Sequence, residues 1–193
     1  MKIKQYNFIR GKSNTCKSIA ACELVKNLRN KTIYFNLNFD NPRKFGSLEG
    51  SKVVFMTMQN QSYSSLLKNI ISLNDDCFEM WNFVFDSTDR LEGSFTEFLE
   101  ALPKNHRYFF VTNNISVKPD VPTYNWEQSE IMSYHDFYII PPNSVSVFDM
   151  IKTESGDIHM YNLNTKESCN IGDISQSIRN MKINEVLSNE TET

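Results

Sequence analysis

The chain of 193 residues lacks the features that mark several common protein classes. Its four cysteines have no C-x-x-C spacing and its three histidines stand alone, which argues against a zinc site. No segment reaches the apolar length of a membrane span. The first residues also lack the apolar stretch of a secretion signal. We therefore expect a cytoplasmic protein with reduced thiols and no membrane partner.

A strong charge of either sign is also missing. The 20 Lys and Arg residues nearly balance the 23 Asp and Glu residues, which leaves a formal net charge of -3. This balance provides no general attraction to nucleic acid, so binding of DNA or RNA requires a local basic patch. Arginines are few, and Arg90 and Arg107 are isolated. Their scarcity disfavours a small-molecule or nucleotide kinase, which needs an arginine-rich lid.

Apolar periodicity predicts a single α/β domain over residues 1–172, followed by a polar tail over residues 173–193. Strands are predicted over 3–9, 32–39, 53–58, 81–85 and 108–111, with helices over 19–28, 63–71 and 95–102. Further strands are predicted over 135–140, 144–152 and 157–163, the last two joined by a turn at 155–157. This order predicts a central, mostly parallel sheet flanked by helices, with antiparallel strands near the C-terminus.

A segment between the first strand and the first helix resembles a phosphate-binding loop. It follows the pattern G-x-x-x-x-G-K-[ST], except that Cys16 stands where the pattern has its second glycine. Backbone amides at a helix N-terminus can surround a phosphate, Lys17 can reach the β and γ phosphates, and Ser18 can bind Mg²⁺. The residues expected to bind the nucleotide are Gly11, Ser13, Asn14, Thr15, Cys16, Lys17 and Ser18.

Two further positions bear on the chemistry of this loop. Glycine is used at the position of Cys16 because the backbone there adopts dihedrals that a Cβ resists, so cysteine is expected to strain or reshape the loop. Asp86 ends the apolar run 81–85, where a carboxylate is suited to hold Mg²⁺ through water. The alternative for Asp86 is a capping role in the turn or helix that follows.

The order of these motifs resembles the RecA-like ATPases, in particular the branch of the replicative helicase DnaB, KaiC and RadA. The run 83–86 resembles their Walker B strand, 111–114 their sensor strand, and 151–156 their terminal hairpin element. The run 34–39 resembles the strand that ends in the family's catalytic acid. The resemblance implies ATP and Mg²⁺ as cofactors, and oligomers with nucleotide sites between subunits.

Several positions depart from the family pattern. Asn38 falls where the family has its water-activating glutamate, and an amide cannot take a proton from water. Glu154 falls where the family has the arginine of its hairpin finger, and Asn113 replaces the glutamine of the sensor strand. A shift of alignment would bring Asp40 to the catalytic position. Asp40 and Asp86 are therefore the candidate catalytic carboxylates.

The sequence favours a degenerate RecA-like domain that acts as a nucleotide-binding or assembly module, linked to DNA processing, with weak or absent ATP hydrolysis. Its expected partners are further copies of the chain or an active ATPase. The alternative is a working minimal Mg-ATPase, in which Lys17, Ser18 and Asp86 bind Mg-ATP and Asp40 activates water.

Overall fold

The computed structural model describes residues 3–28, 30–37, 53–57, 62–74, 79–88, 91–112 and 142–173. Strands and helices alternate as the periodicity predicts, in the order β1 (Tyr6–Gly11), α1 (Lys17–Lys26), β2 (Thr32–Asn36), β3 (Val53–Thr57), α2 (Tyr63–Asn74), β4 (Asn82–Asp86), α3 (Phe95–Ala101) and β5 (Arg107–Thr112). The C-terminal part contains η5 (Pro142–Ser144), β6 (Val145–Lys152), β7 (Ile158–Asn162), β8 (Glu167–Asn170) and η6 (Ile171–Asp173).

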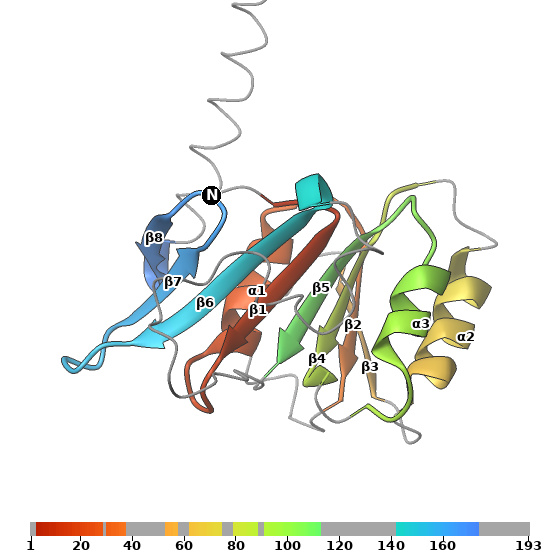
Figure 1. Ribbon diagram of the computed structural model, residues 1–193, viewed down its shortest axis with the longest axis horizontal. Helices are drawn as coiled ribbons and strands as arrows, with labels where there is room; N and C mark the ends of the chain where they lie inside the picture. Colours follow the sequence, from red (N-terminus) through yellow and green to blue (C-terminus); the bar gives the residue numbers. More distant parts are fainter. Residues whose placement is uncertain are drawn as a thin grey trace, which may run out of the picture.

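The described strands form one sheet in the order β3-β2-β4-β5-β1-β6-β7-β8 (Figure 1). The strands from β3 to β6 in this order are parallel, whereas β7 is antiparallel to β6 and β8 is antiparallel to β7. The predicted α/β class, with antiparallel strands near the C-terminus, is thus confirmed. β6 has neighbours of both kinds, because it pairs with the central strand β1 in parallel and with β7 in antiparallel orientation.

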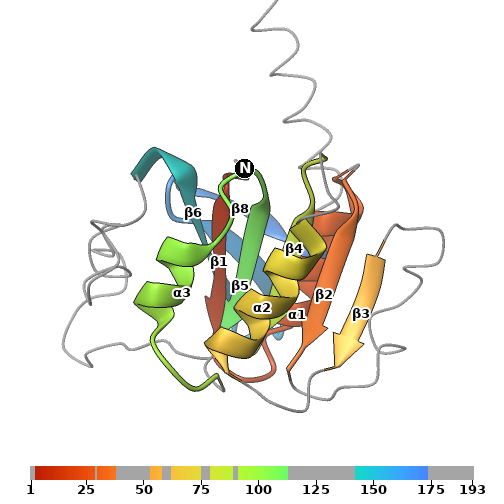
Figure 2. The same ribbon diagram turned by 90° about the vertical axis from the view of Figure 1, so that its right-hand side faces the viewer.

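Helices cover both faces of this sheet. Figures 1 and 2 show α1 on one face, with α2 and α3 on the other. Because successive side chains of a strand point to opposite faces, the strands divide their apolar residues between two cores. The α1 core contains Ile9, Leu24, Tyr34, Phe109 and Phe148, among others. The core under α2 and α3 is rich in aromatic rings, including Phe35, Phe83, Phe85, Tyr108 and Phe110.

The starts of α1 and α3 differ in how they are capped. Ser94 precedes α3, and its side chain accepts a hydrogen bond from the Glu97 amide at 3.2 Å, which is a common arrangement at helix starts. The residue before α1 is Cys16, which makes no side-chain hydrogen bond of this kind. The amides at the start of α1 therefore receive no capping hydrogen bond from the side chain of Cys16.

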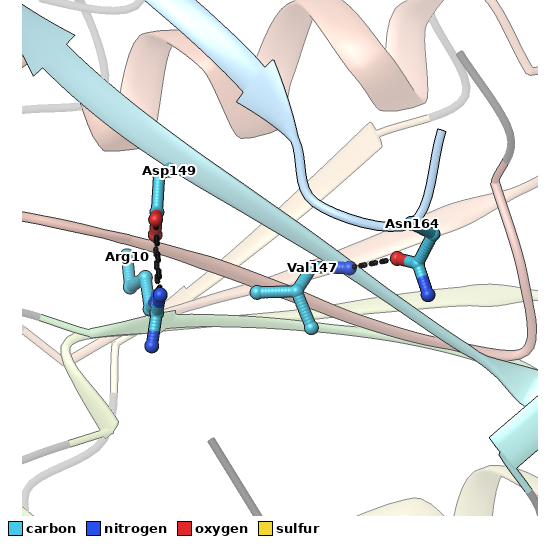
Figure 3. A network of polar contacts seen from close by, with 4 residues as sticks. All are labelled: Arg10, Val147, Asp149 and Asn164. Atoms are coloured by element: carbon cyan, nitrogen blue, oxygen red, sulfur yellow. Dashed lines mark hydrogen bonds and ion pairs between the residues drawn. The ribbon is translucent and has the colours of Figure 1, made fainter. Parts of the chain in front are cut away.

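An asparagine after β7 extends the sheet beside the first residues of β6. The ladder between β6 and β7 begins at Phe148, one residue after Val147. The Asn164 side chain accepts from the Val147 amide at 2.9 Å (Figure 3). It also donates to the Val145 carbonyl at 3.2 Å. A side-chain amide thus supplies the hydrogen bonds that a neighbouring strand would otherwise make.

Some predicted features lie outside the described residues. They are the strand predicted over 135–140 and the polar tail after residue 173. Among the described helices, none combines the length and the apolar character needed to cross a membrane.

Candidate functional site

The predicted phosphate loop connects the central strand β1 to α1. β1 ends at Gly11 and α1 begins at Lys17, so strand, loop and helix follow one another as the motif requires. The neighbours of β1 are β5 and β6, both parallel to it. Figure 1 shows the arrowheads of β1, β4 and β5 at one edge of the sheet. Ligands of open parallel sheets bind at this carboxyl edge.

The loop backbone alternates in handedness. Asn14 has a φ of 62°, and Cys16 has a φ of 57° with a ψ of 28°, both in the left-handed region. Alternating right- and left-handed residues turn successive amides toward one point, which is how backbone nests bind anions. Cys16 therefore adopts the kind of conformation for which the motif uses glycine. A left-handed residue with a Cβ costs about 1–2 kcal/mol, and this is the strain expected from the sequence.

Gly11 closes the base of the loop against β6. A Cβ at this position would lie 2.6 Å from Thr15 Oγ1 and 2.8 Å from the Met150 carbonyl oxygen. Real Cβ atoms do not approach other atoms so closely. The first glycine of the motif is thus required by close packing between the loop and the neighbouring strand.

Lys17 and Thr15 hold the loop in a closed form. The Lys17 ammonium donates to the Lys12 carbonyl at 2.7 Å, and the Thr15 hydroxyl donates to the same oxygen at 2.8 Å. Lys17 is only 7% exposed and Thr15 only 5%. A cation is therefore kept inside the loop, whereas the neighbouring residues Ser13 and Asn14 are exposed.

Asp86 lies at the end of β4, on the same face of the sheet as α1. Asp86 is 1% exposed, and its Oδ2 accepts a hydrogen bond from the Tyr34 hydroxyl at 2.6 Å. α3 begins only after Ser94, so Asp86 does not cap that helix. The capping role considered for Asp86 therefore does not extend to the next helix.

Tyr34 connects the two residues that were predicted to bind Mg²⁺. Its hydroxyl donates to Asp86, and Ser18 at the start of α1 is near enough to exert a small lowering effect on the pKa of Tyr34. The thiol of Cys22, one turn further along α1, is also near Tyr34, which acts to lower the pKa of that thiol. The partly buried Ser18 and the buried Asp86 are thus both close to the Tyr34 hydroxyl.

The pKa values of Tyr34 and Cys22 are both raised in this cluster. Burial raises the pKa of Tyr34 well above its usual value of 10.0, and the negative charge of Asp86 raises it further. Burial, with a smaller contribution from Asp86, raises the pKa of the Cys22 thiol to about 12. Both groups therefore keep their protons at neutral pH, and Tyr34 serves as a neutral hydrogen-bond donor to the Asp86 carboxylate.

The hydrogen bond from Tyr34 competes with a bound Mg²⁺ for one oxygen of Asp86. The ion prefers carboxylate oxygens together with several retained water molecules. Here one carboxylate oxygen of Asp86 is engaged by a phenol, which is a hydrogen-bond donor. Within the described ranges, no group of three or more His, Cys, Asp or Glu residues is placed to hold a metal ion.

Sequence reasoning assigned no site role to Tyr34. It placed Tyr34 within a strand, and the alternation of that strand puts Tyr34 and Asn36 on the face opposite Phe35. Since Asn36 lies in register with Asp86, Tyr34 is the diagonal neighbour of Asp86 on that face. The pattern indicated the face, but the pairing of β2 with β4 comes from the structure.

Residues with a left-handed backbone gather at the carboxyl edge of the sheet. Four non-glycine residues of the described part have positive φ, and three of them are Asn14, Cys16 and Ser87, with Ser87 directly after Asp86. Backbone strain of this kind gathers at binding and catalytic sites.

The remaining predicted positions are only partly covered by the structure. Asn38, Asp40 and Asn113 lie outside the described residues, so the catalytic role of Asp40 stays a prediction. Glu154 is exposed in the turn between β6 and β7, the position of the predicted hairpin element.

Comparison with protein-family models and with curated proteins finds no match for this chain.

Proposed function

We propose that this chain is a degenerate RecA-like phosphate-loop domain that binds a nucleotide through its phosphates, with weak or no ATP hydrolysis. The single observation that carries the proposal is the conformation of the loop. Asn14 and Cys16 adopt left-handed dihedrals around a buried Lys17, at the N-terminus of α1. Amides, a helix dipole and a cation together favour a phosphate group at this point.

The order of the strands supports the same interpretation. The loop-bearing strand β1 and the acid-bearing strand β4 both pair with β5, which resembles the sensor strand of the family. Loop and acid therefore lie at the same edge of a parallel sheet, one strand apart. This is the placement that a RecA-like core needs in order to combine phosphate binding with an acidic residue.

Three features support weak or absent turnover. Cys16 places a Cβ in a conformation suited to glycine, Tyr34 engages the carboxylate of Asp86, and Glu154 stands at the finger position that is cationic in the family. Hydrolysis of a phosphoanhydride depends mainly on positioning and on positive charge around the phosphates. Each of these features removes part of that machinery.

The link to DNA processing and to oligomers follows from the RecA resemblance. In this role the chain would act as an assembly module, bound to copies of itself or to an active ATPase. Its net charge of -3 gives no broad attraction to nucleic acid. Binding to another protein is thus favoured over direct binding to nucleic acid as the role of the module.

Calorimetric titration of the full chain with ATP tests nucleotide binding. We expect saturable binding that Lys17→Ala weakens by about tenfold or more, because a charge-assisted contact with phosphate is lost. Lys26→Ala is the matched control, since it removes the same charge from the other end of the same helix. Binding that both variants weaken equally, or no binding at all, would contradict the proposal.

Release of inorganic phosphate then separates the two candidate activities. A binding module should release no more phosphate than a blank without protein. Turnover that disappears in Lys17→Ala but persists in Lys26→Ala would instead support the minimal Mg-ATPase. Asp40→Asn would next test whether Asp40 activates water in that case.

A further inference from the structure

We propose that the Tyr34 hydroxyl takes the place of a magnesium ion between Ser18 and Asp86, so that the loop binds its phosphate ligand without a divalent cation. The inference rests on the proposed function, because it concerns how the same loop binds phosphates. The ligand class is a metal-free diphosphate or polyphosphate group. Such a group is found both in nucleotides and in inorganic pyrophosphate, and the two sources are separated below.

The geometry places the phenol oxygen between the two predicted metal ligands. Tyr34 donates to Asp86 Oδ2 at 2.6 Å, and Ser18 is near enough to the same hydroxyl to exert a small lowering effect on its pKa. In a magnesium-dependent phosphate loop, the ion and its waters bridge the corresponding hydroxyl and carboxylate. The hydroxyl of Tyr34 is neutral and engages one oxygen of Asp86.

Displacing this hydroxyl is costly. Tyr34 is 0% exposed and Asp86 is 1% exposed, so their hydrogen bond lies in the interior, where water does not replace it. A hydrogen bond to a charged group contributes roughly twice as much as a neutral one. A cation that binds Asp86 through Oδ2 would have to break this bond and move a ring that is packed into the α1 core.

The local charge also suits a metal-free ligand. Lys17 supplies a buried cation on the loop side, while the Tyr34 hydroxyl supplies the hydrogen that Asp86 would otherwise need from water or a metal. One oxygen of the carboxylate is thereby engaged by a hydrogen bond. Its repulsion of an anion in the loop is reduced without an added cation.

Titration calorimetry in magnesium chloride and in EDTA tests the inference, with ADP and with inorganic pyrophosphate as separate probes. For the natural chain we expect an affinity in magnesium chloride that is equal to or lower than the affinity in EDTA, because magnesium only competes for the free anion. Binding of both probes would assign recognition to the diphosphate alone. Binding of ADP alone would add recognition of the nucleoside.

Tyr34→Phe tests the assigned residue. Without the hydroxyl, Ser18 and Asp86 are free to share a cation, and we expect the affinity to become higher in magnesium chloride than in EDTA by about tenfold. Tyr108→Phe is the matched control, because Tyr108 is equally buried and its hydroxyl donates to the Pro103 carbonyl at 2.6 Å in the other core. This control should keep the behaviour of the natural chain.

The outcomes separate the two proposals. An affinity of the natural chain that magnesium raises would overturn the inference and leave the proposed function intact. A Tyr34→Phe variant that folds but stays indifferent to magnesium would also overturn it. Absence of binding by every probe in both solutions would overturn both proposals. Should Tyr34→Phe fail to fold, the comparison of magnesium and EDTA for the natural chain still decides.

Discussion

The guanidinium of Arg10 and the carboxylate of Asp149 form a two-point ion pair across the parallel strands β1 and β6, directly before the loop glycine (Figure 3). Arg10 Nε contacts Asp149 Oδ1, and the second contact, from a terminal nitrogen to Oδ2, measures 2.9 Å. The side chain of Arg10 is 6% exposed, whereas that of Asp149 is 22% exposed. The two partners therefore differ in how easily water replaces the lost contact.

This difference predicts an asymmetric effect of mutation. Asp149→Asn leaves the buried cation of Arg10 poorly compensated, so we expect a loss of about 3 kcal/mol in the free energy of unfolding. Arg10→Met leaves a carboxylate that water reaches, and the loss should be smaller. Urea denaturation of both variants measures the difference. Equal losses would show that exposure does not control the cost of breaking the pair.

The close approach around Gly11 predicts that this position tolerates no side chain. Gly11→Ala would bring a Cβ to within 2.8 Å of the Met150 backbone, so β1 and β6 must move apart. We expect a loss of roughly 1–3 kcal/mol, as for other overpacked sites. Gly172→Ala is the control, since its nearest neighbour would be 3.6 Å away, and it should change stability by less than about 0.5 kcal/mol. A Gly11→Ala variant as stable as this control would contradict the packing argument.

The left-handed backbone at Cys16 predicts a preference for glycine. Cys16→Gly and Cys16→Ala both remove the thiol, but only the alanine variant keeps a Cβ at a φ of 57°. We expect the glycine variant to be more stable than the alanine variant by about 1 kcal/mol, which thermal or urea unfolding can resolve. The glycine variant should also bind ATP more tightly, since it restores the motif. An alanine variant as stable as glycine would show that the position is not strained.

His106 predicts a loss of stability in mild acid. It is 1% exposed, its Nδ1 accepts the Trp81 amide at 3.2 Å, and its ring meets the edge of Phe83. Burial lowers the pKa of His106 below its usual 6.5. As the pH falls below about 6.5, His106 takes up a proton in the unfolded chain before it does so in the folded chain. The free energy of unfolding that His106 contributes is therefore fully present above about pH 6.5 and is lost as the pH falls toward the lower folded-state pKa.

The free energy of unfolding, measured by urea at about pH 7.5 and about pH 5.5, checks this dependence. Other groups also titrate in this range, so the useful quantity is the difference between the natural chain and His106→Asn. We expect the variant to lose less stability on acidification than the natural chain. Equal losses would exclude His106 as the group responsible.

Local patterns in the sequence determined the elements that position the site. Alternation along 32–39 predicted β2, the apolar run before Asp86 predicted β4, and helical spacing after the loop predicted α1. These signals are local, because each depends on which side chains share a face over a few residues. The glycine-like conformation at Cys16 was also predictable, since the motif itself states where a left-handed residue is needed.

The pairing of strands was decided by the tertiary structure. Nothing in the local pattern of β2 states that it lies beside β4, and only that pairing brings the Tyr34 hydroxyl onto Asp86. The same holds for β6, whose parallel pairing with β1 brings Asp149 beside Arg10. Contacts between residues far apart in sequence depend on how whole faces pack together. The apolar period of a strand or a helix does not specify which strand becomes the neighbour.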